Sequence, residues 1–294
     1  MLARAARNRK PTDGPDVDYD LIAIDLDGTL LDAAHRVPAR NRAALHAAHE
    51  AGLKVVLCTG RSYTETRPVV DQIGLDLDAT VTVGGALISE AVTGRTLECE
   101  AFPQALAFEL IAWLRALDHT VLWLHDAWEA GFDGYIIAGP RRHPRVDQWK
   151  AKVPCVFEEA DAPPASRWPA LRLTVVDGVE QLRGLSPRIE RAFGGRATHN
   201  VIEVPLYGIS VIESFVAPVD KWSGILKLCR RWQIDPLRVV AVGDDVNDLA
   251  MVRAAGLGVA VANARPEVKQ SATRLTASND ACGVADLIDE LLRA

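Results

Sequence analysis

Polar residues of a few related kinds follow three apolar segments that lie far apart in the chain. They are Asp25 and Asp27 after the first segment, Thr59 and Gly60 after the second, and Asp244, Asn247 and Asp248 after the third. Carboxylates that are brought together raise each other's pKa, and a hard divalent cation relieves their repulsion. Magnesium takes a few carboxylate oxygens and leaves its other positions to water or phosphate. Hydroxyl, amide and ammonium groups donate to phosphate oxygens. With Lys221 as the cation, the residue types predict magnesium-assisted phosphoryl transfer.

One edge of a parallel sheet would bring these residues together. Apolar runs that alternate with amphipathic segments predict strand 21–24, helix 38–51, strand 53–57, helix 63–73 and strand 80–83. The same rhythm returns later with helix 221–232, strand 239–242, helix 245–254, strand 258–261 and helix 284–292. Continuously apolar strands are typical of sheets covered on both faces, and alternation with helices indicates a doubly wound α/β fold. Ligands bind beyond the carboxyl ends of such strands, where the polar residues lie.

The middle of the chain has a different pattern, which mixes hairpins with helices. It predicts a hairpin at 87–89 and 96–98, helix 103–117, strand 121–124, loops over the proline-rich and charged residues 138–169, strand 171–176 and helix 179–193. We therefore expect a separate α+β domain inserted into the α/β core. The expected parts are a disordered basic tail at 1–18, a core at 19–86 and 206–294, and the inserted domain at 87–205.

Composition limits the classes of function. The chain has 294 residues and a formal net charge of -6, so no global basic field favours nucleic acid. No uninterrupted apolar stretch is long enough for a membrane-spanning helix. The five cysteines form no Cys-x-x-Cys pair, which favours a reducing compartment over a zinc site. The basic first residues are not followed by the apolar stretch of a secretory signal, so we expect a cytoplasmic protein. We also expect a monomer or a small homo-oligomer.

Four segments resemble the motifs of the haloacid dehalogenase superfamily. They are Asp25-Leu26-Asp27-Gly28-Thr29-Leu30, Cys58-Thr59-Gly60-Arg61, Lys221, and Gly243-Asp244-Asp245-Val246-Asn247-Asp248. Their order, and the long insertion between the second and third, resemble the Cof-type phosphatases, which carry a large α+β cap there. Gly283-Val284-Ala285 also resembles that subfamily. The resemblance extends over residues 19–294 and implies a Rossmann-like core with an inserted cap domain.

The resemblance also implies a role for each motif residue. Asp25 would be the nucleophile that forms an aspartyl-phosphate, and Asp27 would be the general acid and base. Magnesium would be held by Asp25, the main-chain carbonyl of Asp27, and Asp244. The phosphoryl oxygens would be held by Leu26 through its amide, Thr59, Gly60, Lys221 and Asn247. Asp248 would orient Lys221 or a metal-bound water, and Asp245 would be either a ligand or a solvent-facing helix start.

The substrate depends on the cap, where the sequence is least informative. Candidate specificity residues there are His125, Asp126, Trp128, Arg141, Arg142, His143, His199 and Asn200. One departure from the family is Gly84-Gly85-Ala86, where relatives often have Asn-Gly-Ala, so a side chain that could contact substrate is missing. Small phosphorylated metabolites, with sugar phosphates first, are the expected substrates by analogy with the family. A sugar phosphomutase and a non-catalytic, phosphate-binding regulatory protein are the alternatives.

Overall fold

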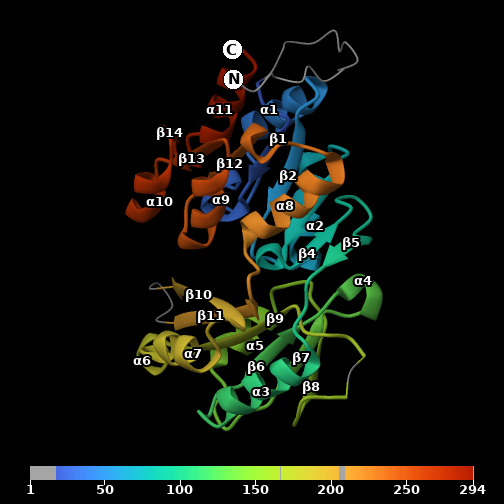
Figure 1. The fold of residues 1–294 in the computed structure, drawn as a ribbon, viewed down its shortest axis with the longest axis vertical. Coiled ribbons are helices and arrows are strands. Elements are labelled where there is room, and N and C mark those ends of the chain that lie inside the picture. Colours follow the sequence, from blue (N-terminus) through green and yellow to red (C-terminus); the bar gives the residue numbers. More distant parts are fainter. Residues whose placement is uncertain (1–17, 166, 205–208, 294) are drawn as a thin grey trace, which may run out of the picture.

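The computed structural model describes residues 18–165, 167–204 and 209–293, so the tail expected at 1–18 lies outside it except for Asp18. Two sheets follow one another along the long axis of the molecule (Figure 1). The first is a mainly parallel sheet with helices on both faces, and the second is mixed. This arrangement confirms an α/β core with an inserted α+β cap.

The core sheet has the strand order β14-β13-β12-β1-β2-β3-β4-β5. Its parallel strands are β1 (Leu21–Ile24), β2 (Lys54–Cys58), β3 (Ala79–Thr82), β12 (Val239–Gly243), β13 (Leu257–Val261) and β14 (Arg274–Thr276). The antiparallel strands are β4 (Leu87–Ser89) and β5 (Thr96–Cys99). Every residue of β1 is fully buried, which explains why this strand is apolar throughout.

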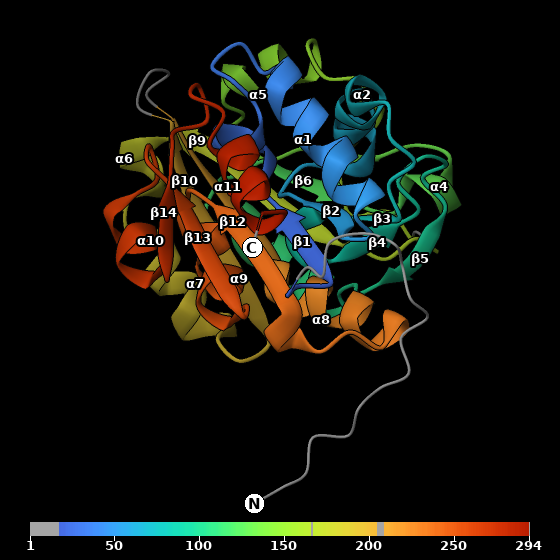
Figure 2. The same ribbon diagram turned by 90° about the horizontal axis from the view of Figure 1, so that it is seen from above.

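Helices cover both faces of the core sheet. They are α1 (Ala39–Glu50), α2 (Tyr63–Ile73), α8 (Lys221–Trp232), α9 (Leu249–Ala254), α10 (Pro266–Ser271) and α11 (Gly283–Leu291). Figure 2 shows α1, α2 and α11 on one face and α8 and α9 on the other. Capping fixes where the helices next to the site begin: Ser62 and Glu65 form a capping box on α2, and Asp220 and Ser223 form one on α8.

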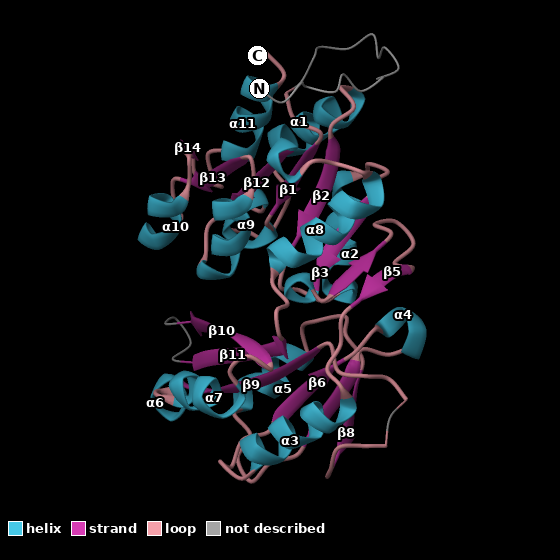
Figure 3. Cartoon of the chain, viewed as in Figure 1, coloured by secondary structure: helices cyan, strands magenta, loops and turns pink. Residues whose placement is uncertain are grey.

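The second sheet, which we call the cap sheet, has the strand order β10-β11-β9-β6-β7-β8 (Figure 3). Its strands are β6 (Val121–Leu124), β7 (Gly134–Ile137), β8 (Phe157–Ala160), β9 (Arg172–Gly178), β10 (Ala197–Val204) and β11 (Ile209–Val216). Its helices are α3 (Gln104–Arg115), α4 (Ala127–Ala130), α5 (Pro144–Lys150), α6 (Val179–Leu182) and α7 (Leu185–Phe193).

Alternate residues of the cap sheet point to opposite faces. Trp123, Leu173 and Ile212 pack on the far side with α3 and α7. Leu122 and Phe215 pack on the side that faces the core, together with Val146 of α5. The alternation of side chains therefore gives the cap sheet two apolar faces, and one of them packs against the core at Val83, Ala86 and Leu87.

The structure differs from the expected boundaries where chain segments change sheets. β4 and β5 extend the core sheet, and β11 pairs with β9 and β10 in the cap sheet. The chain therefore passes from the core sheet to the cap after β5 and returns to the core after β11, not at residues 86 and 205. Pairing decides this, because a strand belongs to the sheet whose backbone groups it satisfies.

Two local expectations in the cap also fail. The segment 138–169, expected to be loops, contains α5 and β8. His143 caps α5 and Pro144 occupies its first turn, while Val146 is buried, so a short helix forms despite the charges. The helix expected at 179–193 is divided into α6 and α7 at Gly184, whose φ of 75° no regular helix adopts.

Candidate active site

The strand ends that carry the motif residues are level with one another. Ile24, the last residue of β1, pairs with Leu57 of β2 and with Val242 of β12. Asp25, Thr59 and Asp244 therefore leave the sheet at the same edge, as the parallel arrangement predicts. The turn after β1 is tight, and Gly28 has a φ of 77° within it.

Lys221 is the buried cation at the centre of the site. It begins α8, and its Nζ donates at 2.6 Å to Oδ1 of Asp25 and at 2.6 Å to Oδ1 of Asp248. Burial alone would lower the pKa of Lys221, but the two carboxylates raise it above its usual value, so the ammonium stays charged. Burial and the neighbouring Asp248 raise the pKa of Asp25, and Lys221 opposes that rise.

The carboxylates beside Lys221 fit a metal ion. One oxygen from each of Asp25, Asp244 and Asp248 lies within 4.8 Å of the others. Asp248 is already engaged, because Oδ1 binds Lys221 and Oδ2 accepts from the amides of Asp244 and Asp245. Among the described contacts, Oδ1 of Asp25 binds Lys221 and Oδ1 of Asp244 accepts from Thr29, which leaves their Oδ2 atoms for a cation. Asp248 therefore positions its neighbours.

The carboxyl of Asp244 lies in surroundings that disfavour its negative charge. Burial, followed by the charge of Asp248, raises its pKa to about 6, and the hydroxyl of Thr29 partly opposes this. A divalent cation between Asp25 and Asp244 would remove that penalty. Asp245 faces away from this pair, toward Arg265 at 2.7 Å, and caps the turn that begins at Val246. Of the two roles expected for Asp245, metal ligand or first residue of a helix, its position fits the second.

Asp27 lies at the exposed side of the same edge. Its carboxylate accepts two hydrogen bonds from Arg61, one of them from Nε to Oδ2 at 2.7 Å. His35 lies 3.4 Å from its Oδ1. Burial would raise the pKa of Asp27, but Arg61 and then His35 lower it below its usual value. In this arrangement the carboxyl of Asp27 is ionised, and Arg61, the last residue of the second motif, stabilises that state.

Thr59, Gly60 and Asn247 form a cradle of polar groups opposite Asp25. Thr59 is buried, and its amide and carbonyl are tied to the third strand and to Gly84, which fixes the loop. Oδ1 of Asn247 is buried without a hydrogen-bond partner among the described residues. A buried, unsatisfied amide oxygen is costly, so its retention here indicates a side chain held ready for a ligand.

Most of the residues predicted for the site meet in one chamber of about 570 Å³ between the two sheets. Its lining includes Asp25, Asp27, Thr59, Gly60, Asp244 and Asn247. Lys221 and Asp248 lie behind Asp25, fully buried. Leu26 is also fully buried and is not among the lining residues.

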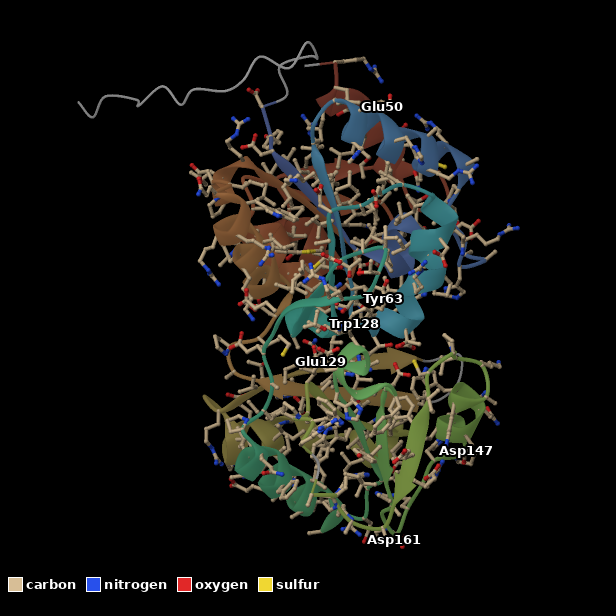
Figure 4. The ribbon with its side chains drawn as sticks, turned by 90° about the vertical axis from the view of Figure 1, so that its right-hand side faces the viewer. Glu50, Tyr63, Trp128, Glu129, Asp147 and Asp161 are labelled. Atoms are coloured by element: carbon tan, nitrogen blue, oxygen red, sulfur yellow. The ribbon has the colours of Figure 1, made fainter. Side chains whose placement is uncertain are left out.

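The cap residues singled out from the sequence lie away from this chamber. His125, Asp126 and Trp128 line a small pocket together with Tyr63. Figure 4 shows Tyr63 and Trp128 near each other, between the core and the cap. The others have structural partners in the cap: Arg141 binds Asp177, Arg142 binds Glu159, His143 caps α5, and His199 contacts Ser186. Asn200 is not among the lining residues.

Sequence reasoning missed several charged residues of the chamber, and the two that pair with each other are Arg172 and Glu213. Nη1 of Arg172 donates at 2.6 Å to the carbonyl of Gly60 and lies 2.7 Å from Oε1 of Glu213. Burial raises the pKa of Glu213, and Arg172 opposes the rise. The available signal was a charged residue close to apolar ones in each segment, since such residues are rarely buried without a partner.

The structure explains why Gly84 stands where members of the family often have asparagine. Gly84 has a φ of 63°, and a Cβ there would lie 2.9 Å from the ring of Phe215. The ring of Phe215 thus occupies the space in which a larger side chain at Gly84 would stand. The absent side chain is replaced by an apolar surface contributed by the cap.

The sequence as a whole matches the family model described as haloacid dehalogenase-like hydrolase over residues 22–288. The chain belongs to the haloacid dehalogenase-like hydrolase family. Among its relatives, the putative phosphatase YxeH of Bacillus subtilis (strain 168) is 30% identical over 285 residues, which cover 94% of this chain and 99% of that protein. Pyridoxal phosphate phosphatase YbhA of Escherichia coli (strain K12) is 27% identical over 281 residues, covering 91% and 97%.

Solved structures of the haloacid dehalogenase-like family share the whole fold. A haloacid dehalogenase-like hydrolase from B. subtilis superimposes with a TM-score of 0.77 at 24% identity, covering 92% of this chain and 99% of that one. A putative HAD/COF-like hydrolase from Plasmodium vivax gives 0.78 at 23% identity, covering 95% and 97%. The family model and the relatives identify the chain as a haloacid dehalogenase-like phosphatase, a phosphoric monoester hydrolase. Among the described residues, no helix has the length and apolar character needed to cross a bilayer.

Proposed function

We propose that the chain is a magnesium-dependent phosphatase that hydrolyses small phosphorylated metabolites through an aspartyl-phosphate on Asp25. The observation that carries the proposal is the buried ammonium of Lys221, held at 2.6 Å by both Asp25 and Asp248. A lysine in that place keeps one oxygen of Asp25 oriented and offsets charge as phosphate approaches.

In the first half-reaction, an oxygen of Asp25 attacks phosphorus, and the bond from phosphorus to the leaving oxygen breaks. Asp27 gives the leaving oxygen its proton, which requires that Asp27 first take up a proton and leave Arg61. Thr59, the amide of Gly60, and Asn247 hold the phosphoryl oxygens during the transfer. A bound magnesium ion would supply charge neutralisation between Asp25, the Asp27 carbonyl and Asp244.

In the second half-reaction, water attacks the phosphorus of the aspartyl-phosphate. Asp27 takes a proton from that water, the bond between phosphorus and Asp25 breaks, and inorganic phosphate leaves. The ion pair with Arg61 supports this step, because it keeps Asp27 in the ionised form that accepts a proton. Asp27 ends this step protonated, and it pairs again with Arg61 once that proton has passed to solvent.

The substrate is a small phosphorylated metabolite, and the relatives act on different ones. Curated relatives are named for pyridoxal phosphate and for 5-amino-6-(5-phospho-D-ribitylamino)uracil. Sugar phosphates were the expectation from family analogy, and the chamber is large enough for all three classes. A sugar phosphomutase, the alternative expected from the sequence, is tested by the same assay.

The test is phosphate release from a panel of phosphorylated compounds with magnesium, for the wild type and Asp25→Asn. Asp71→Asn is a matched control, because Asp71 lies exposed on α2 and pairs only with Arg67 in the described contacts. We expect Asp25→Asn to abolish turnover without loss of fold and Asp71→Asn to retain it. Asp25→Asn turnover within about tenfold of the wild type, a difference of only about 1.4 kcal/mol in barrier height, would exclude Asp25 as the nucleophile. Conversion of a sugar phosphate to its isomer would favour the mutase.

A further inference from the structure

The turn that follows β1 is held from outside by side-chain amides. It spans residues 25–31 and is irregular, and Asp27 and Gly28 have non-helical backbone angles within it. Two of its amides, those of Leu30 and Leu31, bond back to carbonyls inside the turn. An irregular turn also leaves carbonyls that no helix or strand satisfies, and such groups need partners when they are buried. Here the partners come from three other segments of the core.

Three asparagines supply these partners, each through its Nδ2 group. They bind the carbonyls of three turn residues: Gly28 from Asn263 at 2.7 Å, Leu30 from Asn41 at 3.0 Å, and Leu31 from Asn279 at 2.9 Å. Asn41 lies on α1, Asn263 follows β13, and Asn279 follows β14. The turn is therefore fastened to parts of the core that lie far apart in the sequence.

Backbone amides orient two of these asparagines. The amide of Asn279 donates at 3.0 Å to Oδ1 of Asn263. The amide of Ala285 donates at 3.1 Å to Oδ1 of Asn41. Because the oxygen and the nitrogen lie on opposite sides of the amide group, a bond to the oxygen aims the nitrogen the other way, toward the turn. A flip of either side-chain amide would break two hydrogen bonds at once.

One segment, residues 278–285, supplies most of this support. It contains Asn279 and ends in Gly283-Val284-Ala285, the motif that resembles the Cof-type phosphatases. A Cβ on Gly283 would lie 2.0 Å from the carbonyl oxygen of Ala277, so only glycine allows the chain to fold back so closely. The next two residues of the motif are fully buried. The motif thus returns the chain from β14, with β13 and β12 in between, to the turn after β1.

These hydrogen bonds flank the carbonyl of Asp27, the main-chain group proposed for magnesium. On one side of it, Asn263 holds the carbonyl of Gly28. On the other side, the amide of Leu31 donates at 2.9 Å to the carbonyl of Leu26. A main-chain carbonyl cannot rotate by itself, because it lies in a planar peptide unit whose direction the adjacent backbone sets. The two fixed neighbours therefore determine where the Asp27 carbonyl points, as groups outside a metal site orient its ligands.

We propose that Asn41, Asn263 and Asn279 form a clamp on this turn that sets the magnesium affinity of the site. None of the three is among the residues that line the chamber, so they are positioning residues that act through the carbonyls they hold. The inference rests on the proposed function, and it assigns part of the metal affinity to side chains outside the four motifs. It also gives the segment 278–285 a role in the site.

The experiment compares the wild type with Asn263→Ala, Asn279→Ala and Ser278→Ala. Asn263 is exposed, so its variant tests the clamp even if replacement of the buried Asn279 prevents folding. Ser278→Ala is the matched control, because Oγ of Ser278 accepts from the amide of Ala281 within the same segment and reaches no residue of the turn in the described contacts. Titration calorimetry measures magnesium binding without substrate, and hydrogen exchange of the peptide that contains residues 25–31 measures opening of the turn.

We expect Asn263→Ala and Asn279→Ala to bind magnesium more weakly by about tenfold or more. Hydrogen exchange of the amides in the turn should be faster by about tenfold or more, because the turn opens more often. Ser278→Ala should match the wild type in both measurements. Release of phosphate from p-nitrophenyl phosphate should fall at limiting magnesium and recover at saturating magnesium. A merely structural role would lower stability and leave the magnesium affinity of the folded protein unchanged.

The outcomes separate the clamp from the function on which it rests. Wild-type magnesium affinity in folded Asn263→Ala would overturn the clamp and leave the phosphatase in place. Equal weakening in Ser278→Ala would also overturn it, because the loss would then come from general loosening of the segment. A wild-type protein that binds no magnesium would instead overturn the proposed function, and the clamp with it.

Discussion

Replacing Lys221 by methionine tests the electrostatic centre of the site. The side chain of Lys221 is 1% exposed, and its ammonium separates Asp25 from Asp248 at 2.6 Å on each side. Methionine fills a similar volume without a charge. The variant therefore leaves two carboxylates facing each other in a buried site with no cation between them.

The expected loss in the free energy of unfolding is about 3–5 kcal/mol in the presence of a chelator, the range for breaking a buried ion pair from one side. The loss also depends on pH. Without Lys221, the pKa of Asp25 rises above its already raised wild-type value, so the folded variant binds a proton that the unfolded chain releases. A carboxyl with a raised pKa loses stability as pH rises, so we expect a larger penalty near pH 8 than near pH 5.5.

Urea unfolding followed by circular dichroism measures this penalty, with Lys227→Met as the control on the same helix. Lys227 is also buried, but its partners Glu98 and Glu100 are 49% and 36% exposed, so its removal should cost only about 0–1 kcal/mol. Added magnesium should restore part of the stability of Lys221→Met, because a second cation then compensates Asp25. A loss below about 1 kcal/mol, or one independent of pH, would refute the reasoning.

Three further outcomes follow from the same geometry. EDTA should abolish turnover and magnesium should restore it, and undiminished hydrolysis without metal would contradict a cation between Asp25 and Asp244. Arg61→Met should raise the pKa of Asp27 and move the limb of the pH–rate profile that reports Asp27 to higher pH, whereas an unmoved limb would show that another group titrates. Gly28→Ala would bring a methyl group 2.4 Å from Oδ2 of Asp244 and should weaken magnesium binding by about tenfold or more in titration calorimetry. Gly52→Ala is the control, because Gly52 has a similar φ of 84° but open space around its added methyl group. Equal magnesium affinity in the two variants would argue against the clash with Asp244.

The core was predictable because its strands are buried on both faces. Leu21–Ile24 and Val239–Gly243 are apolar throughout, and turn or helix signals follow each of them, so both position and type could be inferred. The position of the site could be predicted for the same reason, because the motif residues lie directly after the carboxyl ends of these buried strands. The capping box at Ser62 explains why α2 begins where the periodicity predicts, and the left-handed Gly74 explains where it ends.

The cap was less predictable because its strands have two different faces and its contacts are not local. In β11, Val211 and Glu213 face the chamber while Ile212 enters the far core, so no single apolar run marks the strand. Arg172 meets Glu213 only because β9 pairs with β11. Nothing near Arg172 in the sequence indicates that its partner is Glu213, or that its target is the carbonyl of Gly60.

The position of β1 has a consequence for synthesis of the chain. β1 lies in the sheet between β2 and β12, yet residue 239 is made long after the first strand. While the cap is translated, the edge of Leu21–Ile24 that will pair with β12 therefore has no partner strand. Unpaired apolar strand edges are prone to association. The site is also assembled late, because Asp25 is synthesised early whereas Lys221 and Asp244 are synthesised near the end of the chain. A nascent chain thus contains Asp25, the nucleophile proposed above, for most of its translation before Lys221 and Asp244 are synthesised.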